Sequence, residues 1–149
     1  NPKTMTNKLN VFTLAKGKAK FQNTKIFDSR TSANYIRQFF GEDIEIYESC
    51  FILLLNRSNT TIGYAKISQG GICGTIVDVK IICKYAIDCL ASTAILCHNH
   101  PSGSLKPSTA DRDITAKAKA ALDLVDCQLI DHIILSSEGY FSFADEGLI

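Results

Sequence analysis

The sequence predicts a single layered α/β domain whose sheet mixes parallel and antiparallel strands. Helix-type and strand-type hydrophobic periods follow one another in the order α-β-β-α-β-α-β-β, with no internal repeat. The chain has 149 residues, 46% of them hydrophobic, which suits one domain with a core of its own. Its longest apolar run, Phe51–Leu55, is far shorter than the roughly 20 residues that a membrane span requires. We therefore expect no membrane association.

The first half of the domain is predicted to contain a helix and a pair of strands. The helix covers residues 32–40 and ends at Gly41. Strands are predicted at Cys50–Leu55 and Thr61–Ser68, joined by a hairpin-type turn at residues 56–59. The apolar stripe that predicts the helix consists of Tyr35, Ile36, Phe39 and Phe40.

The second half alternates helices and strands. Asp78 is a candidate N-cap for a helix, and the short apolar run Ala94–Cys97 is typical of a buried strand. A second amphipathic helix is expected to begin near Thr109. The last two strands are predicted at Leu129–Leu135 and Tyr140–Phe143.

The cysteines indicate a reducing environment. Six of them are present, none forms a Cys-x-x-Cys pair, and most lie within apolar stretches. Buried thiols behave as small hydrophobic groups, whereas disulfide frameworks belong to short secreted chains. We therefore expect reduced, structural cysteines in a cytoplasmic protein. They stand at positions 50, 73, 83, 89, 97 and 127.

Charge is distributed unevenly along the chain. Residues 1–25 carry six lysines and no acid, whereas the remainder has 10 basic against 15 acidic residues, a net charge of −5. We expect residues 1–29 to form a partly ordered basic arm. Such an arm fits a weak contact with DNA phosphates, and it fits a solvated terminus equally.

The segment after the central strand contains the chemically distinctive residues. His98 and His100 are two residues apart, so their rings point to the same side of an extended segment. Asp111 stands in the first turn of the following helix. Two imidazoles and a carboxylate can hold zinc with one position open for water. However, Ser108-x-x-Asp111 is also a capping-box pattern. The spacing alone leaves a metal site and a capped helix open.

These residues carry a resemblance to a known family. His98-Asn99-His100-Pro101, six residues and Ser108-Thr109-Ala110-Asp111 are similar to the JAMM/MPN metalloprotease signature His-x-His-Pro-x6-Ser-x-x-Asp. More narrowly, residues 30–149 resemble the RadC-like JAB domain of the DNA repair protein RadC family. The chain departs from family usage at Lys80, where Arg is usual, and at Ser104, where an acidic or amide residue is common. The further matching words are Glu48–Phe51, Leu53–Asn56, Ser68–Gly71, Gly74–Val77 and Asp131–Ile134.

The resemblance implies a fold and a set of roles. The fold is an α-β-α layered JAB/MPN architecture, similar to that of cytidine deaminases. One Zn2+ per chain is implied at His98, His100 and Asp111. Glu48 is implied as the general acid/base, and Ser108 as a hydrogen-bond donor to the developing oxyanion.

Two of these assignments have alternatives in the residues themselves, and His132 remains to be placed. Glu48 could be an exposed residue at a strand start, with Glu45 or Glu42 as the base. Ser108 could be an N-cap and nothing more. His132 is expected to support the core or a ligand, because the ligand set is complete without it.

The implied function is a zinc-dependent JAMM-type hydrolase that cleaves a peptide or isopeptide bond in a peptide or protein substrate. The alternative is a DNA-associated protein whose metal site is structural or only binds. A nucleobase deaminase is disfavoured, because His-x-Glu and a downstream Pro-Cys-x-x-Cys are both missing from the sequence. The substrate and the oligomeric state do not follow from the residues.

Overall fold

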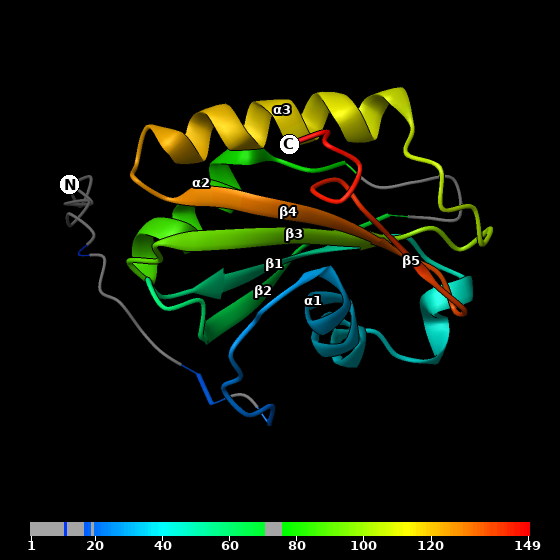
Figure 1. Ribbon diagram of the computed structural model, residues 1–149, viewed down its shortest axis with the longest axis horizontal. Coiled ribbons are helices and arrows are strands. Elements are labelled where there is room, and N and C mark those ends of the chain that lie inside the picture. Colours follow the sequence, from blue (N-terminus) through cyan, green and yellow to red (C-terminus); the bar gives the residue numbers. More distant parts are fainter. Residues whose placement is uncertain (1–10, 12–16, 19, 71–75) are drawn as a thin grey trace, which may run out of the picture.

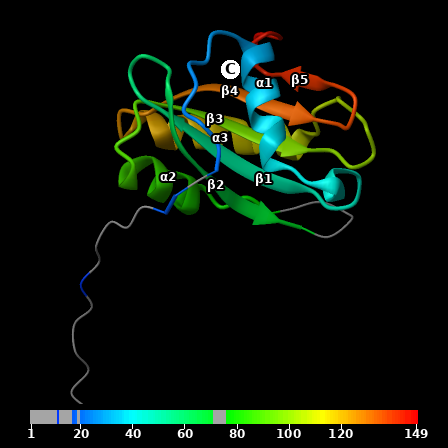
Figure 2. The ribbon, with the colours of Figure 1, turned by 90° about the horizontal axis from the view of Figure 1, so that it is seen from below.

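The computed structural model describes residues 11, 17–18, 20–70 and 76–149, which build three layers. Helices α2 (Val79–Asp88) and α3 (Thr109–Asp123) cover one face of a five-stranded sheet, and α1 (Ser29–Ile36) covers the other face (Figure 1). Seen from below, α1 lies in front of the sheet while α2 and α3 lie behind it (Figure 2). The predicted α-β-α layering is confirmed.

The sheet is mixed, as predicted. Its strand order is β2-β1-β3-β4-β5. Among the described strands, β3 and β4 run parallel, and the other neighbours are antiparallel. Helix α3 makes the crossover from β3 to β4, which such a parallel pair requires. The strands are β1 (Ser49–Leu55), β2 (Thr61–Gln69), β3 (Thr93–Asn99), β4 (Gln128–Leu135) and β5 (Tyr140–Ser142).

The central strands are buried on both faces, and for this reason they appear in the sequence as continuous apolar runs. Every residue of β1 is buried. Cys50, Ile52 and Leu54 pack into the core beneath α2 and α3. The alternate residues of β1, beginning with Phe51, pack into the core beneath α1. His98 lies on the α3 side of β3, because it stands two residues after Leu96 of that core.

Each of the three helices begins at a side-chain cap. Asp78 accepts a hydrogen bond from the backbone N–H of Lys80 at 2.8 Å, so the predicted start of α2 is confirmed. Asp28 accepts from the N–H of Thr31 at 2.7 Å, and α1 therefore begins before the predicted residue 32. The α-helix ends at Ile36 and continues to Phe39 as a 3-10 turn. A second 3-10 turn, Glu42–Glu45, leads into β1.

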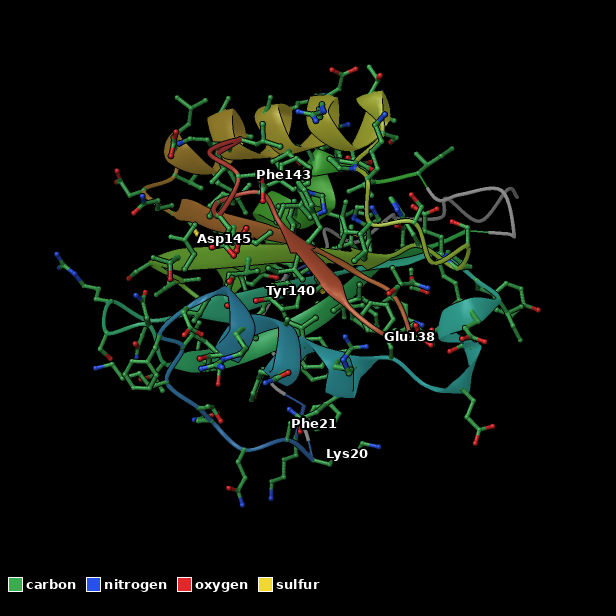
Figure 3. All side chains as sticks on the ribbon, turned by 45° about the vertical axis from the view of Figure 1, so that its right-hand side comes forward. Lys20, Phe21, Glu138, Tyr140, Phe143 and Asp145 are labelled. Carbon is green, nitrogen blue, oxygen red and sulfur yellow. The ribbon has the colours of Figure 1, made fainter. Side chains whose placement is uncertain are left out.

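Part of the predicted arm contacts the domain. Phe21 packs against Phe39 and Tyr64, with ring centroids 5.7 and 5.5 Å apart. The N–H of Thr24 donates to Thr61 Oγ1 at 2.8 Å, and Ile26 is buried in the core beneath α1. Phe21 and Lys20 lie on the α1 side of the sheet (Figure 3). Lys3, Lys8, Lys16, Gly71, Cys73 and Gly74 lie outside the described residues.

Four of the described cysteines, Cys50, Cys83, Cys97 and Cys127, are free thiols. Burial raises the pKa of Cys50 to about 12 and that of Cys127 to about 11, so both remain neutral. Cys50, Cys97 and Cys127 are buried, as expected of structural cysteines, whereas Cys83 is only partly buried and Cys89 is exposed. Within the described part of the chain, we find no helix whose length and apolarity would let it cross a bilayer.

Candidate metal centre

The candidate centre lies where β3 ends and α3 begins. His98 is the penultimate residue of β3, and His100 follows the strand directly. A loop through Pro107 then reaches Ser108, the N-cap of α3. The carboxyl end of a parallel strand and the start of its crossover helix form a usual place for a site in α/β folds.

Three of the sequence-predicted side chains converge there. His98 Nε2 lies 3.1 Å from Asp111 Oδ1, and His100 Nε2 lies 3.3 Å from Asp111 Oδ2. The two imidazole Nε2 atoms are 3.0 Å apart. Glu48 completes the group, whose potential ligand atoms all lie within 4.8 Å of one another. The structure therefore brings the predicted ligands and the predicted base into one cluster.

The partner of His100 fixes its neutral tautomer. His100 Nδ1 lies 2.7 Å from the carbonyl oxygen of Ser104. A carbonyl oxygen only accepts, so Nδ1 carries the hydrogen and donates it. The lone pair of the neutral ring is then on Nε2, the atom that faces Asp111. Ser104, where the chain departs from family usage, takes part through its backbone alone in this contact.

A buried chain of hydrogen bonds fixes the neutral tautomer of His98. Thr115 Oγ1 lies 2.6 Å from the carbonyl oxygen of Asp111 and therefore donates its hydrogen to it. The hydroxyl then accepts from His132 Nδ1 at 2.6 Å, which leaves His132 Nε2 as an acceptor. His98 Nδ1 donates to that atom at 2.7 Å. The lone pair of His98 is consequently on Nε2, facing the cluster.

His132 therefore contacts His98 without being a member of the cluster, which agrees with its expected supporting role. It is 1% exposed, and its ring stacks on that of Phe143 with centroids 4.9 Å apart. Phe143 lies between β5 and α3 (Figure 3). Burial lowers the pKa of His132 well below the ordinary value, so the ring stays neutral and can accept the hydrogen of His98.

Two imidazole lone pairs and a carboxylate at these distances require a positive charge among them. The Asp111 carboxylate raises the pKa of His100 by accepting a hydrogen bond from it, and burial of the ring opposes this effect. Burial opposes ionisation of Asp111 too, but its contacts with His100 and His98 hold its pKa well below the usual range. A proton on His100 supplies the required charge, and so does a metal ion. Two imidazole nitrogens with one carboxylate are a donor set that fits zinc.

The capping box at α3 is real and compatible with the cluster. Ser108 Oγ accepts from the N–H of Asp111 at 3.0 Å, and the N–H of Ser108 donates to Asp111 Oδ2 at 2.7 Å. Asp111 Oδ2 also faces His100, and Oδ1 faces His98. Of the two alternatives left open by the spacing, the capped helix is therefore present, and it does not exclude a metal site. The cap orients Asp111 toward the cluster.

Glu48 is the carboxylate at the cluster, and its sequence neighbours are not. Glu42 and Glu45 are exposed in the 3-10 turn before β1. Glu48 is half-buried and lines a pocket of about 230 Å3 together with His98 and Asp111. Among the three carboxylates considered from the sequence, Glu48 is the one that belongs to the cluster.

Sequence reasoning missed the residue that holds the Glu48 segment. Asn99 Nδ2 donates to the carbonyl oxygens of Ile44 and Tyr47, at 2.7 and 2.8 Å. Its Oδ1 accepts from the N–H of Ser49 at 2.8 Å. Asn99 is fully buried and lies between two histidines that face the other side of the strand. The sequence did offer a signal for this role. Asn99 alternates with the two histidines, so its side chain points to the opposite face of the strand, where a buried amide needs hydrogen-bond partners.

Comparison with known proteins gives a consistent result. A family model described as the RadC-like JAB domain matches residues 26–148. A UPF0758 protein of Flavobacterium johnsoniae is 44% identical over 124 residues, which are 83% of this chain and 53% of the relative. For a UPF0758 protein of Porphyromonas gingivalis, identity is 42% over 125 residues, covering 83% and 54%.

A UPF0758 protein of Neisseria meningitidis serogroup B is 38% identical over 122 residues, which are 82% of this chain and 53% of that protein. The chain thus spans about half the length of the curated relatives that it matches.

Proposed function

This chain belongs to the RadC-like JAB domain family, and on that premise we propose that it is a zinc-dependent hydrolase that cleaves a peptide or isopeptide bond. One observation carries the proposal. Two imidazole nitrogens, a carboxylate and a second carboxylate converge within 4.8 Å at the rim of a pocket. The free thiols of Cys50, Cys83, Cys97 and Cys127 support a cytoplasmic location.

His98, His100 and Asp111 would hold the zinc ion. A bound zinc ion supplies Lewis acidity and lowers the pKa of a water molecule that it holds. The chain contributes orientation. Because the Nδ1 atoms of both histidines donate to fixed acceptors, their Nε2 lone pairs are held toward the carboxylate of Asp111. Outer hydrogen bonds of this kind are how proteins fix the tautomer of a ligating histidine.

Glu48 is proposed as the proton carrier of the reaction. Hydrolysis adds water across the C–N bond and yields a carboxylic acid and an amine. In the proposal, Glu48 accepts a proton from the attacking water and returns it to the departing nitrogen. Its half-buried position beside His98 and Asp111 supports this role, because a proton carrier must be near the ligands without being one of them. The Asn99 clamp on Ile44, Tyr47 and Ser49 keeps that position rigid.

Ser108 is proposed to stabilise the negative charge that develops on the carbonyl oxygen. Its Oγ accepts from the amide of Asp111, so the hydroxyl hydrogen is not used in that bond. An exposed hydroxyl at a helix N-terminus can donate to an anionic oxygen, and the helix dipole acts in the same direction. The proposed role therefore uses the hydrogen, whereas the cap uses the lone pair.

The test compares two glutamates. Zinc-loaded wild type, Glu48→Gln and Glu45→Gln would be assayed on libraries of peptide and isopeptide-linked substrates. We expect Glu48→Gln to keep its metal and lose about 10²–10⁴-fold in rate. Glu45→Gln, which removes an exposed carboxylate outside the cluster, should retain the wild-type rate. Full activity of Glu48→Gln would contradict the assigned base. A fully loaded wild type that cleaves nothing would favour a site that only binds.

A second candidate function, contact with DNA, rests on a separate observation. Residues 1–25 carry six lysines and no acid. Lys20 and Lys66 also flank an open groove lined by Phe21, Phe39 and Tyr64, and groups of this kind suit phosphates and bases. Wild-type protein should then bind single-stranded DNA with an affinity that falls as salt rises, and Lys20→Gln should weaken it. Affinity that does not depend on salt would contradict this candidate.

A further inference from the structure

A pocket with two chemically different walls opens beside the cluster. Its polar wall carries Glu48, His98 and Asp111, with His132 behind them. Its other described walls are apolar and come from β1, β3, the segment before α2, and α3. The apolar lining consists of Cys50, Ile76, Val77, Leu96, Ala110 and Ile114.

The apolar part is deep, and its mouth is open. Leu96 is fully buried and Cys50 is 2% exposed, so these two residues form a floor. Ile114 is half-buried, while Ala110 on the first turn of α3 is exposed. Water on such a floor finds few hydrogen-bond partners, and replacing it with an apolar group is favourable.

We infer that this pocket receives one uncharged, apolar side chain of the substrate, from the residue that adjoins the bond being cleaved. The inference rests on the proposed function and names the substrate class that the site would prefer. Leu96 and Cys50 offer no partner to an ammonium or a carboxylate, so a charged side chain would lose its hydration without compensation. Glu48 and Asp111 also repel an acidic group from the polar wall.

The volume sets the size of the side chain. The pocket measures about 230 Å3. Sites for drug-sized ligands measure roughly 300–1,000 Å3, whereas an aliphatic cavity of about 150 Å3 holds a benzene molecule. The pocket is therefore large enough for the side chain of leucine, methionine or phenylalanine. Glycine would leave it unfilled.

Binding of small hydroxamates tests the inference without relying on turnover. The hydroxamate group chelates a metal through two oxygens, and its substituent stands in for the substrate side chain. Acetohydroxamate, 4-methylpentanohydroxamate and the monohydroxamate of succinic acid would be titrated calorimetrically into zinc-loaded protein. We expect the branched apolar probe to bind at least about 10-fold more tightly than acetohydroxamate. The carboxylate probe should show no such gain.

Two variants on α3 locate the effect. Ala110→Leu fills the pocket from its lining, whereas Ala116→Leu adds the same atoms on an exposed part of the helix away from it. The tighter binding of 4-methylpentanohydroxamate relative to acetohydroxamate should disappear in Ala110→Leu and persist in Ala116→Leu. Acetohydroxamate should bind wild type and Ala116→Leu alike.

The outcomes separate the pocket from the metal site. If acetohydroxamate binds and the branched probe gains nothing, the pocket inference is overturned while the metal centre stands. A gain that survives in Ala110→Leu also overturns it. If acetohydroxamate does not bind and the protein takes up no zinc, the proposed function itself fails, and the pocket inference fails with it.

Discussion

Removing the hydroxyl of Thr115 is expected to weaken metal binding without altering any ligand. Thr115→Val preserves the shape and β-branching of the side chain. The lost oxygen donates to the carbonyl of Asp111 and accepts from His132 Nδ1, each at 2.6 Å. Thr115 and His132 are 2% and 1% exposed, so water cannot readily take the place of the hydroxyl.

The structure gives the expected size of the effect. If His132 keeps its tautomer, its Nδ1 hydrogen loses its acceptor, and an unsatisfied buried donor costs about 1–3 kcal/mol of unfolding free energy. If the hydrogen moves to Nε2, it points at His98 Nδ1, and the hydrogen of His98 must move to Nε2. That atom then faces the cluster without a lone pair. Loss of an outer hydrogen bond to a ligand typically weakens metal affinity about 10–100-fold.

The assay measures affinity and tautomer together. Zinc affinity would be determined by competition with a chromophoric chelator, and the histidine ring nitrogens would be followed by 15N NMR. Thr115→Ser, which retains the hydroxyl, serves as the matched control and should bind zinc with wild-type affinity. If Thr115→Val binds zinc as tightly as wild type and the spectrum of His98 is unchanged, the hydrogen-bond chain does not act on the ligand.

Further outcomes follow from the same geometry. Ser108→Ala should reduce the unfolding free energy by about 0.5–2 kcal/mol through loss of the cap and slow turnover about 10²–10³-fold. Ser108→Asp should keep the cap and the zinc but lose activity, and an active, loaded variant would leave Ser108 as a cap alone. Deleting residues 1–25 should lower the melting temperature, because Phe21 and Thr24 contact the domain. Equal melting temperatures would show that these contacts contribute nothing. The pKa of His100 is raised, so protons compete with metal below it, and zinc affinity should fall about tenfold per pH unit there. An affinity that stays level with falling pH would contradict this assignment.

The order of the elements could be predicted because local patterns determine it. Central strands are apolar throughout, and the stripes on α2 and α3 repeat with the helical period. Histidines two apart on a strand must share a face, and Ser108-x-x-Asp111 gives both the cap and the direction of the carboxylate. These local rules pointed to His98, His100 and Asp111 but left a capped helix as the alternative, and the resemblance to the JAMM signature was needed to predict them as one ligand set.

The supporting residues could not be predicted, because they depend on pairing between distant segments. Thr115 reaches His132 across 17 residues, and His132 reaches His98 across 34. Both contacts require the parallel register in which Leu96 pairs with His132, a register that no single segment encodes. The clamp from Asn99 to Tyr47 likewise joins residues 52 positions apart.

The metal content of purified protein tests the central claim most directly. Wild type, Glu48→Gln and His98→Ala would be loaded with zinc, freed of excess metal and measured by elemental analysis. We predict about one zinc per chain in wild type and in Glu48→Gln, because the set of two histidines and one carboxylate is complete without Glu48. We predict none in His98→Ala. Equal zinc in His98→Ala and wild type would contradict the account.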